Sequence, residues 1–483
     1  MAKKRLKLFG IGLLCACMFF GGCGAQGIPA LKGGPEASAA VESQRGSVVK
    51  KGDFLYYVNG AYDSTVSSEF GSADKHQRGY IYRAELDASG AVKADSVQIL
   101  CPKQVYTAAA DAGLFLVGDR IYFGAVTTHR DRRDELLTNY LDLYSVKIDG
   151  TDCREIAVLT SNSFTSRWEE KEGKVYFVYI DSTDSTAKSI EANGTRRTIA
   201  EKYVGTPILG DDGYVYYNKR VEKPDQEGVD EDELRYESYY ETYRAPIDGG
   251  EEELVLAADS EAVNKTYAVT LTRVENNALY YTVTRDSNTL VYAYELTSGK
   301  LVQISANALT TVHKYLGFDG EGNYRGVLAT FQNQFMFIKP EGTGFLQTNL
   351  LENVSLPSTV LTVDGEYLYY TDGSNVLRVQ IGSESGWKSR SEAETIFRGA
   401  INTTTYAPEI VGESLYFMPT STTHPTYASY PYRLKKDRVI PKDTEDEDVE
   451  APEAIGKLTE ADQEIYDEAQ KKIDKENEKN QEA

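Results

Sequence analysis

The sequence predicts an all-β protein built as a β-propeller of four-stranded antiparallel blades, with eight blades favoured over seven. Three observations lead to this fold: a recurring strand pattern, an aromatic content of 11%, and a length of 483 residues that is too great for one small core. Tyrosine alone contributes 35 residues. Tyrosine favours strands, because its ring packs on a pleated surface while its hydroxyl stays accessible.

The strand pattern is a turn with Gly, Asp or Asn followed by an apolar-Tyr-aromatic strand, and it recurs about every 50 residues. Its copies are residues 52–57, 118–123, 173–177, 213–217, 277–281, 365–370 and 412–417, with a degenerate copy at 323–328. A short strand precedes each copy and a hairpin follows it, so each unit predicts one four-stranded blade. We expect the blades to begin near residues 46, 110, 164, 203, 265, 312, 358 and 405. The repeated tyrosines are expected to pack in the core.

The N-terminal residues are typical of a bacterial lipoprotein signal peptide. Four basic residues between positions 3 and 7 precede the apolar and small residues 8–22. That stretch has about 15 residues, fewer than the roughly 20 that a membrane-spanning helix needs. We therefore expect residues 1–22 to act as a cleaved signal peptide.

Residues 20–24, Phe-Gly-Gly-Cys-Gly, resemble the bacterial lipobox. The resemblance implies that Cys23 receives the lipid and that the protein is extracytoplasmic and anchored to the cell membrane. Cys17, which follows Leu14-Cys15-Ala16, is the alternative attachment site, and the length of the signal favours Cys23. Residues 23–45 are rich in Gly, Ala, Ser and Pro, so we expect a flexible tether there.

Residues 369–372, Tyr-Tyr-Thr-Asp, followed by Leu-Arg-Val-Gln-Ile-Gly at 377–382, resemble the YWTD-type propeller of the low-density-lipoprotein-receptor family. Many Gram-positive lipoproteins carry such a propeller. The resemblance covers most of residues 46–441, the predicted propeller domain. Tyr replaces the Trp of the motif and eight units replace six, so the resemblance implies a fold and a surface location without a binding site.

Long connections between the second and third strands of a blade indicate where a ligand binds. Antiparallel alternation brings all these connections to one face, and long loops on a rigid scaffold often carry function. They are long in blades A, B, D and H, at residues 60–79, 127–140, 219–238 and 420–429. In a closed ring H, A and B are consecutive, so their loops predict one site. The candidate ligand-binding residues are His76, Arg78, His129, Arg130, Arg132, Arg133, His424 and Tyr427.

The sequence contains no motif that assigns a reaction. It lacks Gly-x-Ser-x-Gly, His-Glu-x-x-His and a phosphate loop, no cysteine is paired with a local histidine, and no pair of histidines has the close spacing of metal ligands. No catalytic residue, metal or cofactor is therefore predicted. The net charge of −22 argues against nucleic acid as a partner. We expect a binding or scaffolding lipoprotein that holds a glycan, a peptide or an envelope protein, with a secreted hydrolase or lyase acting on a surface polymer as the alternative.

Two cysteines, Cys101 and Cys153, follow the signal region. Their positions in the strand pattern predict that they lie apart, although an oxidising exterior leaves a bridge open. After residue 441 the chain has 16 acidic against 6 basic residues. We expect residues 442–483 to form an acidic tail that is partly helical or disordered.

Overall fold

The computed structural model describes residues 31–60, 79–101, 103–106, 113–127, 129, 131–134, 140–160, 165–224, 236–257, 269–285, 287–351, 359–383, 386–388, 392–404, 406–420 and 431–456. Within them the regular elements are strands, apart from two short 3-10 helices, η2 (Ala94–Ser96) and η4 (Asp446–Asp448). No helix in this part of the chain is long and apolar enough to cross a membrane. The strands form one five-stranded and seven four-stranded antiparallel sheets, which confirms the predicted all-β propeller with eight blades.

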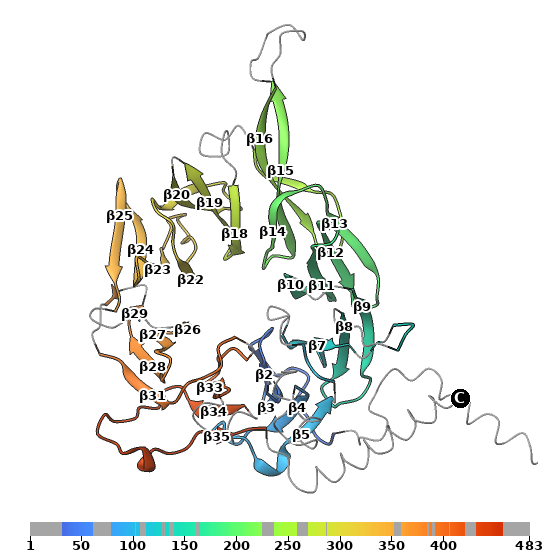
Figure 1. Cartoon of the computed structure of the whole chain (residues 1–483), viewed down its shortest axis with the longest axis vertical. Helices are drawn as coiled ribbons and strands as arrows, with labels where there is room; N and C mark the ends of the chain where they lie inside the picture. The colour runs from blue at the N-terminus through green and yellow to red at the C-terminus, as the bar shows by residue number, and fades with distance from the viewer. Residues whose placement is uncertain are drawn as a thin grey trace, which may run out of the picture. The chain divides into compact units, whose positions relative to one another are not determined.

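The chain divides into two compact units, and unit 1 comprises residues 1–108, 113–162 and 454–483. It holds blades A and B, labelled in Figure 1. Blade A consists of β1 (Val41–Glu42), β2 (Val48–Lys51), β3 (Phe54–Val58), β4 (Ile81–Glu85) and β5 (Gln98–Cys101). Blade B consists of β6 (Phe115–Val117), β7 (Arg120–Val126), β8 (Leu141–Lys147) and β9 (Arg154–Leu159).

Unit 2 comprises residues 109–112 and 163–453 and holds blades C to H. Blade C consists of β10 (Ser166–Lys171), β11 (Lys174–Asp181), β12 (Thr186–Glu191) and β13 (Arg196–Ala200). Blade D consists of β14 (Val204–Leu209), β15 (Tyr214–Pro224), β16 (Tyr236–Pro246) and β17 (Glu253–Leu256). Blade E consists of β18 (Val269–Glu275), β19 (Ala278–Arg285), β20 (Asn288–Glu295) and β21 (Leu301–Ser305).

The last three blades complete the repeat. Blade F consists of β22 (Thr311–Tyr315), β23 (Val327–Phe331), β24 (Gln334–Glu341) and β25 (Gly344–Asn349). Blade G consists of β26 (Thr359–Asp364), β27 (Tyr367–Thr371), β28 (Asn375–Gln380) and β31 (Glu394–Arg398), with a small hairpin of β29 (Gly382–Ser383) and β30 (Gly386–Trp387) before β31. Blade H consists of β32 (Glu409–Val411), β33 (Ser414–Phe417), β34 (Tyr432–Lys435) and β35 (Glu453–Ala454).

The turn between the first and second strands explains the glycine of the sequence repeat. In blade C the two turn residues Glu172 and Gly173 both have positive φ, at 54° and 76°. In blade E the corresponding pair, Asn276 and Asn277, has φ of 52° and 57°. Such turns match the twist of the flanking strands, and Gly and Asn adopt positive φ at least cost. The repeat therefore marks the point where each blade turns into its second strand.

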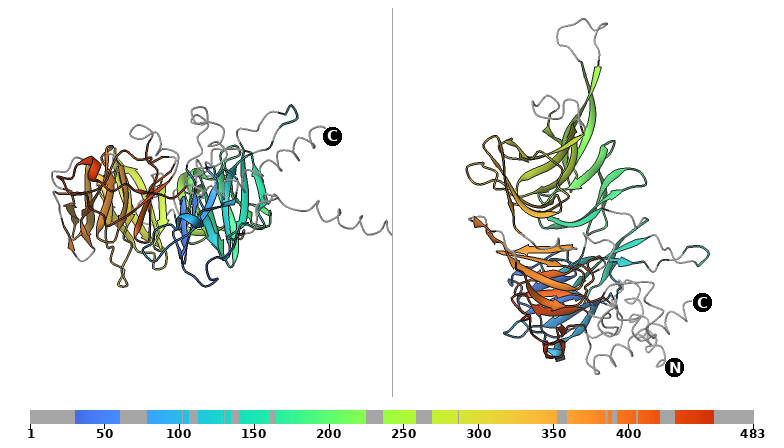
Figure 2. Two further views of the ribbon diagram at one scale, coloured as in Figure 1. Left: turned by 90° about the horizontal axis from the view of Figure 1, so that it is seen from below. Right: turned by 60° about the vertical axis from the view of Figure 1, so that its left-hand side comes forward.

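The predicted tyrosine ladder is buried between neighbouring sheets. In unit 2, Tyr280 of blade E is 0% exposed and packs with Tyr315 and Tyr324 of the blade F segment. The rings of Tyr280 and Tyr315 are stacked with centroids 3.7 Å apart. Figure 2 shows the successive sheets of this unit, coloured from green to orange, standing side by side. Blade E thus buries its tyrosine face against blade F.

Blade D differs from the long loop that the sequence predicts at residues 219–238. The hairpin strands β15 and β16 are 11 residues long each and pair from Tyr214↔Pro246 to Pro224↔Tyr236. They extend well beyond β14 and β17 of the same sheet (Figure 1). Alternating Tyr, Val and Arg residues favour a strand, so the insertion lengthens the hairpin instead of forming a loop at its base.

The N-terminal boundary also differs from the prediction, because residues 31–45 are not a free tether. Val41 and Glu42 form β1, which pairs with β2 of blade A. The Leu31 N–H donates to the Asp149 carbonyl at 3.1 Å, and the buried Arg83 donates to the Lys32 carbonyl at 2.7 Å. These hydrogen bonds hold the segment against unit 1, so a flexible tether can extend no further than residue 30. Residues 1–22 and Cys23 lie outside the described residues.

The C-terminal boundary lies beyond the predicted residue 441. Glu453 and Ala454 form β35, the fourth strand of blade H. The buried Arg433 donates to the Glu453 carboxylate at 2.9 Å. Ile455 is 0% exposed, and its carbonyl accepts a hydrogen bond from the Tyr57 hydroxyl. Residues 442–456 are therefore part of the folded protein, and the remainder of the predicted tail lies outside the described residues.

Candidate functional site

Three metal-ligating side chains meet in blade B. Asp142 lies on β8, Glu155 on β9, and His129 in the connection between β7 and β8. Asp142 and Tyr144 share one face of β8 because they are two residues apart in a strand. A bulge between Leu143 and Tyr144 pairs Tyr144 with Glu155, which brings the Glu155 carboxylate to the same face.

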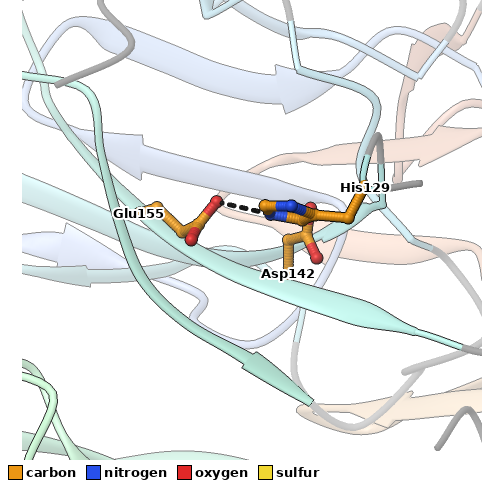
Figure 3. Close-up of side chains that lie close together, drawn as sticks. All are labelled: His129, Asp142 and Glu155. Carbon is orange, nitrogen blue, oxygen red and sulfur yellow. Dashed lines mark hydrogen bonds and ion pairs between the residues drawn. The ribbon is translucent and has the colours of Figure 1, made fainter. Parts of the chain in front are cut away.

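The distances within this group are short (Figure 3). The His129 Nε2 atom lies 3.1 Å from Glu155 Oε2 and 3.8 Å from Asp142 Oδ2. One ligand atom from each of the three residues lies within 4.8 Å of the others. The Tyr144 hydroxyl donates to Glu155 Oε2 at 3.1 Å. We call His129, Asp142 and Glu155 the blade B cluster.

Burial differs sharply across the blade B cluster. The Asp142 side chain is 1% exposed, whereas those of His129 and Glu155 are 45% and 36% exposed. A carboxylate is costly to bury unless a cation or hydrogen bonds stabilise it. The cluster therefore has a fixed, deep carboxylate at its base and two adjustable donors that a ligand can reach from solvent.

Neighbouring groups orient the blade B cluster. The His129 backbone N–H donates to the Thr127 hydroxyl at 3.1 Å, and Thr127 is 4% exposed. The ammonium of Lys103 lies 4.8 Å from the centroid of the Tyr144 ring. The Phe123 ring stacks with the Tyr144 ring, with centroids 6.0 Å apart. Packing around Tyr144 thus fixes the hydroxyl that holds Glu155.

The arrangement offers one imidazole nitrogen and two carboxylates to a single point in space. Such a set suits a divalent cation, and an exposed imidazole–carboxylate pair also suits proton transfer. The sequence predicts no metal site, because the three residues are far apart in the chain. The structure brings them together through the β7–β8 connection and the pairing of β8 with β9.

The predicted site residues divide into two groups. His129 belongs to the blade B cluster, and Arg132 and Arg133 lie exposed in the same connection. The Arg133 N–H donates to Asp131 Oδ1 at 2.7 Å. The other predicted ligand-binding residues lie outside the described residues, and they are His76, Arg78, Arg130, His424 and Tyr427. Whether the loops of blades H, A and B share one site stays a prediction.

Asp142 and Glu155 were not predicted from the sequence. Asp142 could have been noticed in the sequence, because it is the single acidic residue in the run from Leu141 to Val146, all of which is buried in the structure. Charged residues inside buried strands are rare unless they are paired or functional. No feature of the sequence distinguishes Glu155, since it follows Arg154 at the exposed start of β9 like an ordinary surface residue.

The prediction that Cys101 and Cys153 lie apart is wrong. Their sulfur atoms are 3.5 Å apart, and the residues are 1% and 3% exposed. The chain after β5 crosses blade B from the β8–β9 turn towards β7, where Val105 forms a bridge with Ala125. This crossing begins at the turn that contains Cys153, so the end of β5 meets the start of β9.

Comparisons with known proteins assign no family to the chain. No protein-family model and no curated protein matches the chain. Among solved structures, the chain is similar to a puromycin-hydrolyzing peptidase of Mycobacterium tuberculosis, with 11% identity, a TM-score of 0.39, and coverage of 79% of this chain and 58% of that one. An oligogalacturonate lyase of Vibrio parahaemolyticus has 12% identity, a TM-score of 0.32, and coverage of 61% and 73%.

An uncharacterized protein of Listeria monocytogenes has 12% identity and a TM-score of 0.30, with 85% of this chain and 100% of that one covered. The chain spans less than two thirds of the length of the peptidase, at 58%. At these identities the similarity concerns the architecture and not the activity. The eight-bladed propeller is shown by the sheets of the described residues themselves.

Proposed function

We propose that the protein is an exported lipoprotein, anchored through Cys23, whose blade B site binds a ligand on the side that faces away from the membrane. The ligand is a surface glycan, a peptide or an envelope protein. The observation that carries this proposal is that the N-terminal segment bonds to the β8–β9 turn of blade B, whereas His129 lies in the β7–β8 connection at the other end of that blade.

The N-terminal segment reaches the fold at the end of blade B where β8 turns into β9. Leu31 bonds to Asp149 in that turn, and Arg83 donates both to the Lys32 carbonyl at 2.7 Å and to the Ile148 carbonyl at 3.3 Å. About eight residues separate Cys23 from Leu31, and a chain of that length spans at most about 28 Å. A lipid on Cys23 would hold this end of blade B close to the membrane.

His129 and Asp142 of the blade B cluster lie toward the other end, and Glu155 reaches them from near the start of β9. Strand β7 pairs with β8 from Arg120↔Lys147 near the β8–β9 turn to Val126↔Leu141 at the far end. His129 follows Val126, so it lies beyond that far end of β7. The two ends of a seven-residue strand pair are about 20 Å apart.

Charge also indicates that the partner is a ligand and not the membrane surface. The net charge is −22, so the protein as a whole is repelled by anionic lipid headgroups. Arg132 and Arg133 are exposed in the connection that carries His129. Positive side chains beside the blade B cluster favour a ligand that presents carboxylates or other anionic oxygens.

Anchoring is tested by mass spectrometry of the N-terminal peptide from protein isolated from bacterial membranes. The proposal expects diacylglycerol on Cys23 and loss of membrane association in the Cys23→Ala variant. The Cys17→Ala variant is the matched control and should remain anchored. A lipid on Cys17, or anchoring that survives Cys23→Ala, would contradict the proposal.

Orientation is tested by fluorescence quenching with the full lipidated chain in vesicles. A fluorophore is attached at exposed position 119 in the Asp119→Cys variant, or at exposed position 132 in the Arg132→Cys variant. Asp119 lies beside the β8–β9 turn, because its carbonyl accepts from the Ile148 N–H at 2.9 Å. Spin-labelled lipid headgroups should quench position 119 more strongly than position 132. Equal or reversed quenching would refute the proposed orientation.

The exposed His129–Glu155 pair favours one second candidate, a hydrolase or lyase acting on a surface polymer. An imidazole and a carboxylate 3.1 Å apart can pass a proton between them and a bound substrate. Incubation with isolated cell-wall polymer would then release soluble fragments, and the Glu155→Gln variant would release none. Release that is unchanged in that variant would exclude the pair as the reacting group.

A further inference from the structure

We propose that the blade B cluster binds a divalent transition-metal ion through His129 Nε2, an Asp142 oxygen and a Glu155 oxygen. This deepens the ligand-binding function proposed above, because the ion would supply the contact to an anionic ligand.

The separations approach those of a coordination sphere. Ligand atoms in a tetrahedral site lie about 2.0–2.2 Å from the metal, which sets them about 3.3–3.5 Å from one another. The observed separations from His129 Nε2 are 3.1 Å to Glu155 and 3.8 Å to Asp142. All separations are within 4.8 Å, and the Glu155 side chain is exposed, so it has room to move toward a bound ion.

The fixed and adjustable donors have complementary roles. The Asp142 side chain is 1% exposed and supplies a preformed oxygen ligand at the base of the site. The two carboxylates, together with a neutral imidazole, balance the charge of a divalent cation. The Tyr144 hydroxyl donates to Glu155 Oε2 at 3.1 Å and so orients that carboxylate from outside the coordination sphere. Because three protein atoms leave a fourth position open, a ligand oxygen or a water can complete the site.

The donor set selects the metal by its chemistry. Imidazole nitrogen suits Zn²⁺ and related transition metals, carboxylate oxygen suits Mn²⁺, and Ca²⁺ and Mg²⁺ prefer oxygen ligands throughout. The nearby ammonium of Lys103 lies over the Tyr144 ring and is not one of the three ligand groups. We therefore expect Zn²⁺ or Mn²⁺ to bind and Mg²⁺ and Ca²⁺ to bind far more weakly.

Titration calorimetry on the full lipidated chain in detergent tests this site with Zn²⁺, Mn²⁺, Mg²⁺ and Ca²⁺. The expected result is one Zn²⁺ or Mn²⁺ per chain, with affinity at least about tenfold lower in His129→Ala and in Glu155→Gln. Both side chains are partly exposed, so these variants should fold. Glu42→Gln, at another exposed carboxylate of unit 1, is the matched control and should bind as the wild type does.

Two outcomes would overturn the metal site: no stoichiometric binding by the wild type, or equal binding by His129→Ala. Neither outcome would affect the quenching experiment, so failure of the metal site and failure of the anchored orientation are distinguishable. Preferential Ca²⁺ binding would also contradict the proposal, because it would indicate an oxygen-only site.

A second inference comes from an independent pair of residues: we infer that Cys101 and Cys153 form a disulfide after export. Their buried sulfur atoms are 3.5 Å apart, so a small rotation of each side chain brings them to the bonded separation of about 2.05 Å. The bridge would join the last strand of blade A to the β8–β9 turn of blade B. Both residues belong to unit 1.

The chemistry balances with an extracytoplasmic protein disulfide as the oxidant. The Cys153 thiolate attacks that disulfide and forms a mixed disulfide, and the Cys101 thiolate then displaces the oxidant as a dithiol. Two thiols thus lose two protons and two electrons. In the folded chain a hydrogen bond from the Cys101 thiol lowers the pKa of Cys153. Because both residues are buried in the folded chain, oxidation must accompany folding.

Mass spectrometry tests the bridge in protein taken from membranes in the presence of an alkylating agent. After denaturation without reductant, the expected result is a peptide containing Cys101 linked to a peptide containing Cys153. Reduction before alkylation should give two modified peptides, and the Cys153→Ser variant should leave Cys101 open to alkylation. Alkylation of both cysteines in unreduced wild-type protein would overturn the inference.

Discussion

Removal of the last described strand is expected to lower the free energy of unfolding. A chain that stops after residue 452 loses β35 and Ile455, whereas a chain that stops after residue 456 keeps both. The first truncation removes the Glu453 partner of Arg433 and the Ile455 carbonyl that accepts from Tyr57. The second truncation removes only residues beyond the described part of the chain, so it is the matched control.

The magnitude follows from these contacts. Ile455 is 0% exposed, and exposing such a side chain costs about 1.5–3 kcal/mol. The pair between Arg433 and Glu453 has side chains 7% and 31% exposed, and solvent screening limits its contribution to about 1 kcal/mol. The Tyr57 hydrogen bond adds about 1 kcal/mol. Together the loss is about 3–5 kcal/mol, a large part of the roughly 5–15 kcal/mol that stabilises a folded domain.

Urea unfolding followed by tryptophan and tyrosine fluorescence measures this difference. The chain ending at residue 456 should keep the wild-type midpoint, and the chain ending at residue 452 should unfold at clearly lower urea. In the full-length protein Ile455→Ala should destabilise by about 2–4 kcal/mol, since it removes a buried side chain and leaves a cavity. Equal midpoints for the two truncated chains would refute the assignment of β35 and Ile455 to the fold.

Three further predictions concern separate parts of the protein. Arg83→Met should speed tryptic cleavage within residues 31–45, because the side chain that binds the segment is lost; unchanged proteolysis would contradict this. Gly113→Ala should destabilise far more than Gly118→Ala, since both have positive φ but only at position 113 would a Cβ meet a backbone oxygen, at 2.0 Å; equal melting temperatures would be inconsistent with that clash. Burial lowers the pKa of His313 from 6.5 to about 4, so the unfolded chain takes up a proton first and stability falls as pH drops from 6.5 to 4; an NMR titration midpoint near 6.5 would refute this.

The fold could be predicted from the sequence because its signals are local. A turn such as Glu172-Gly173 needs residues that adopt positive φ, and the tyrosines that follow must be buried, so both recur in the sequence. The first strands of blades B and C begin at Phe115 and Ser166, near the predicted residues 110 and 164. Alternation and turn chemistry are therefore sufficient for the blade boundaries.

The site and the ends of the fold could not be predicted, because they depend on long-range pairing. Glu155 meets His129 only through the bulged pairing of β8 with β9, and a bulge shifts which side chains are neighbours. Cys101 meets Cys153 because the chain after β5 crosses blade B. Glu453 is an ordinary acidic residue in the sequence, and only the buried Arg433 gives it a place in blade H.

Anomalous diffraction from crystals of the protein grown with Zn²⁺ tests the central claim, a metal-binding site in blade B, most directly. The account predicts a peak at the zinc edge about 2.0–2.1 Å from the His129 Nε2 atom and about 2.0–2.2 Å from oxygens of Asp142 and Glu155. The account would be contradicted if that peak were absent or lay elsewhere on the chain. In either case His129 would still be hydrogen-bonded to Glu155.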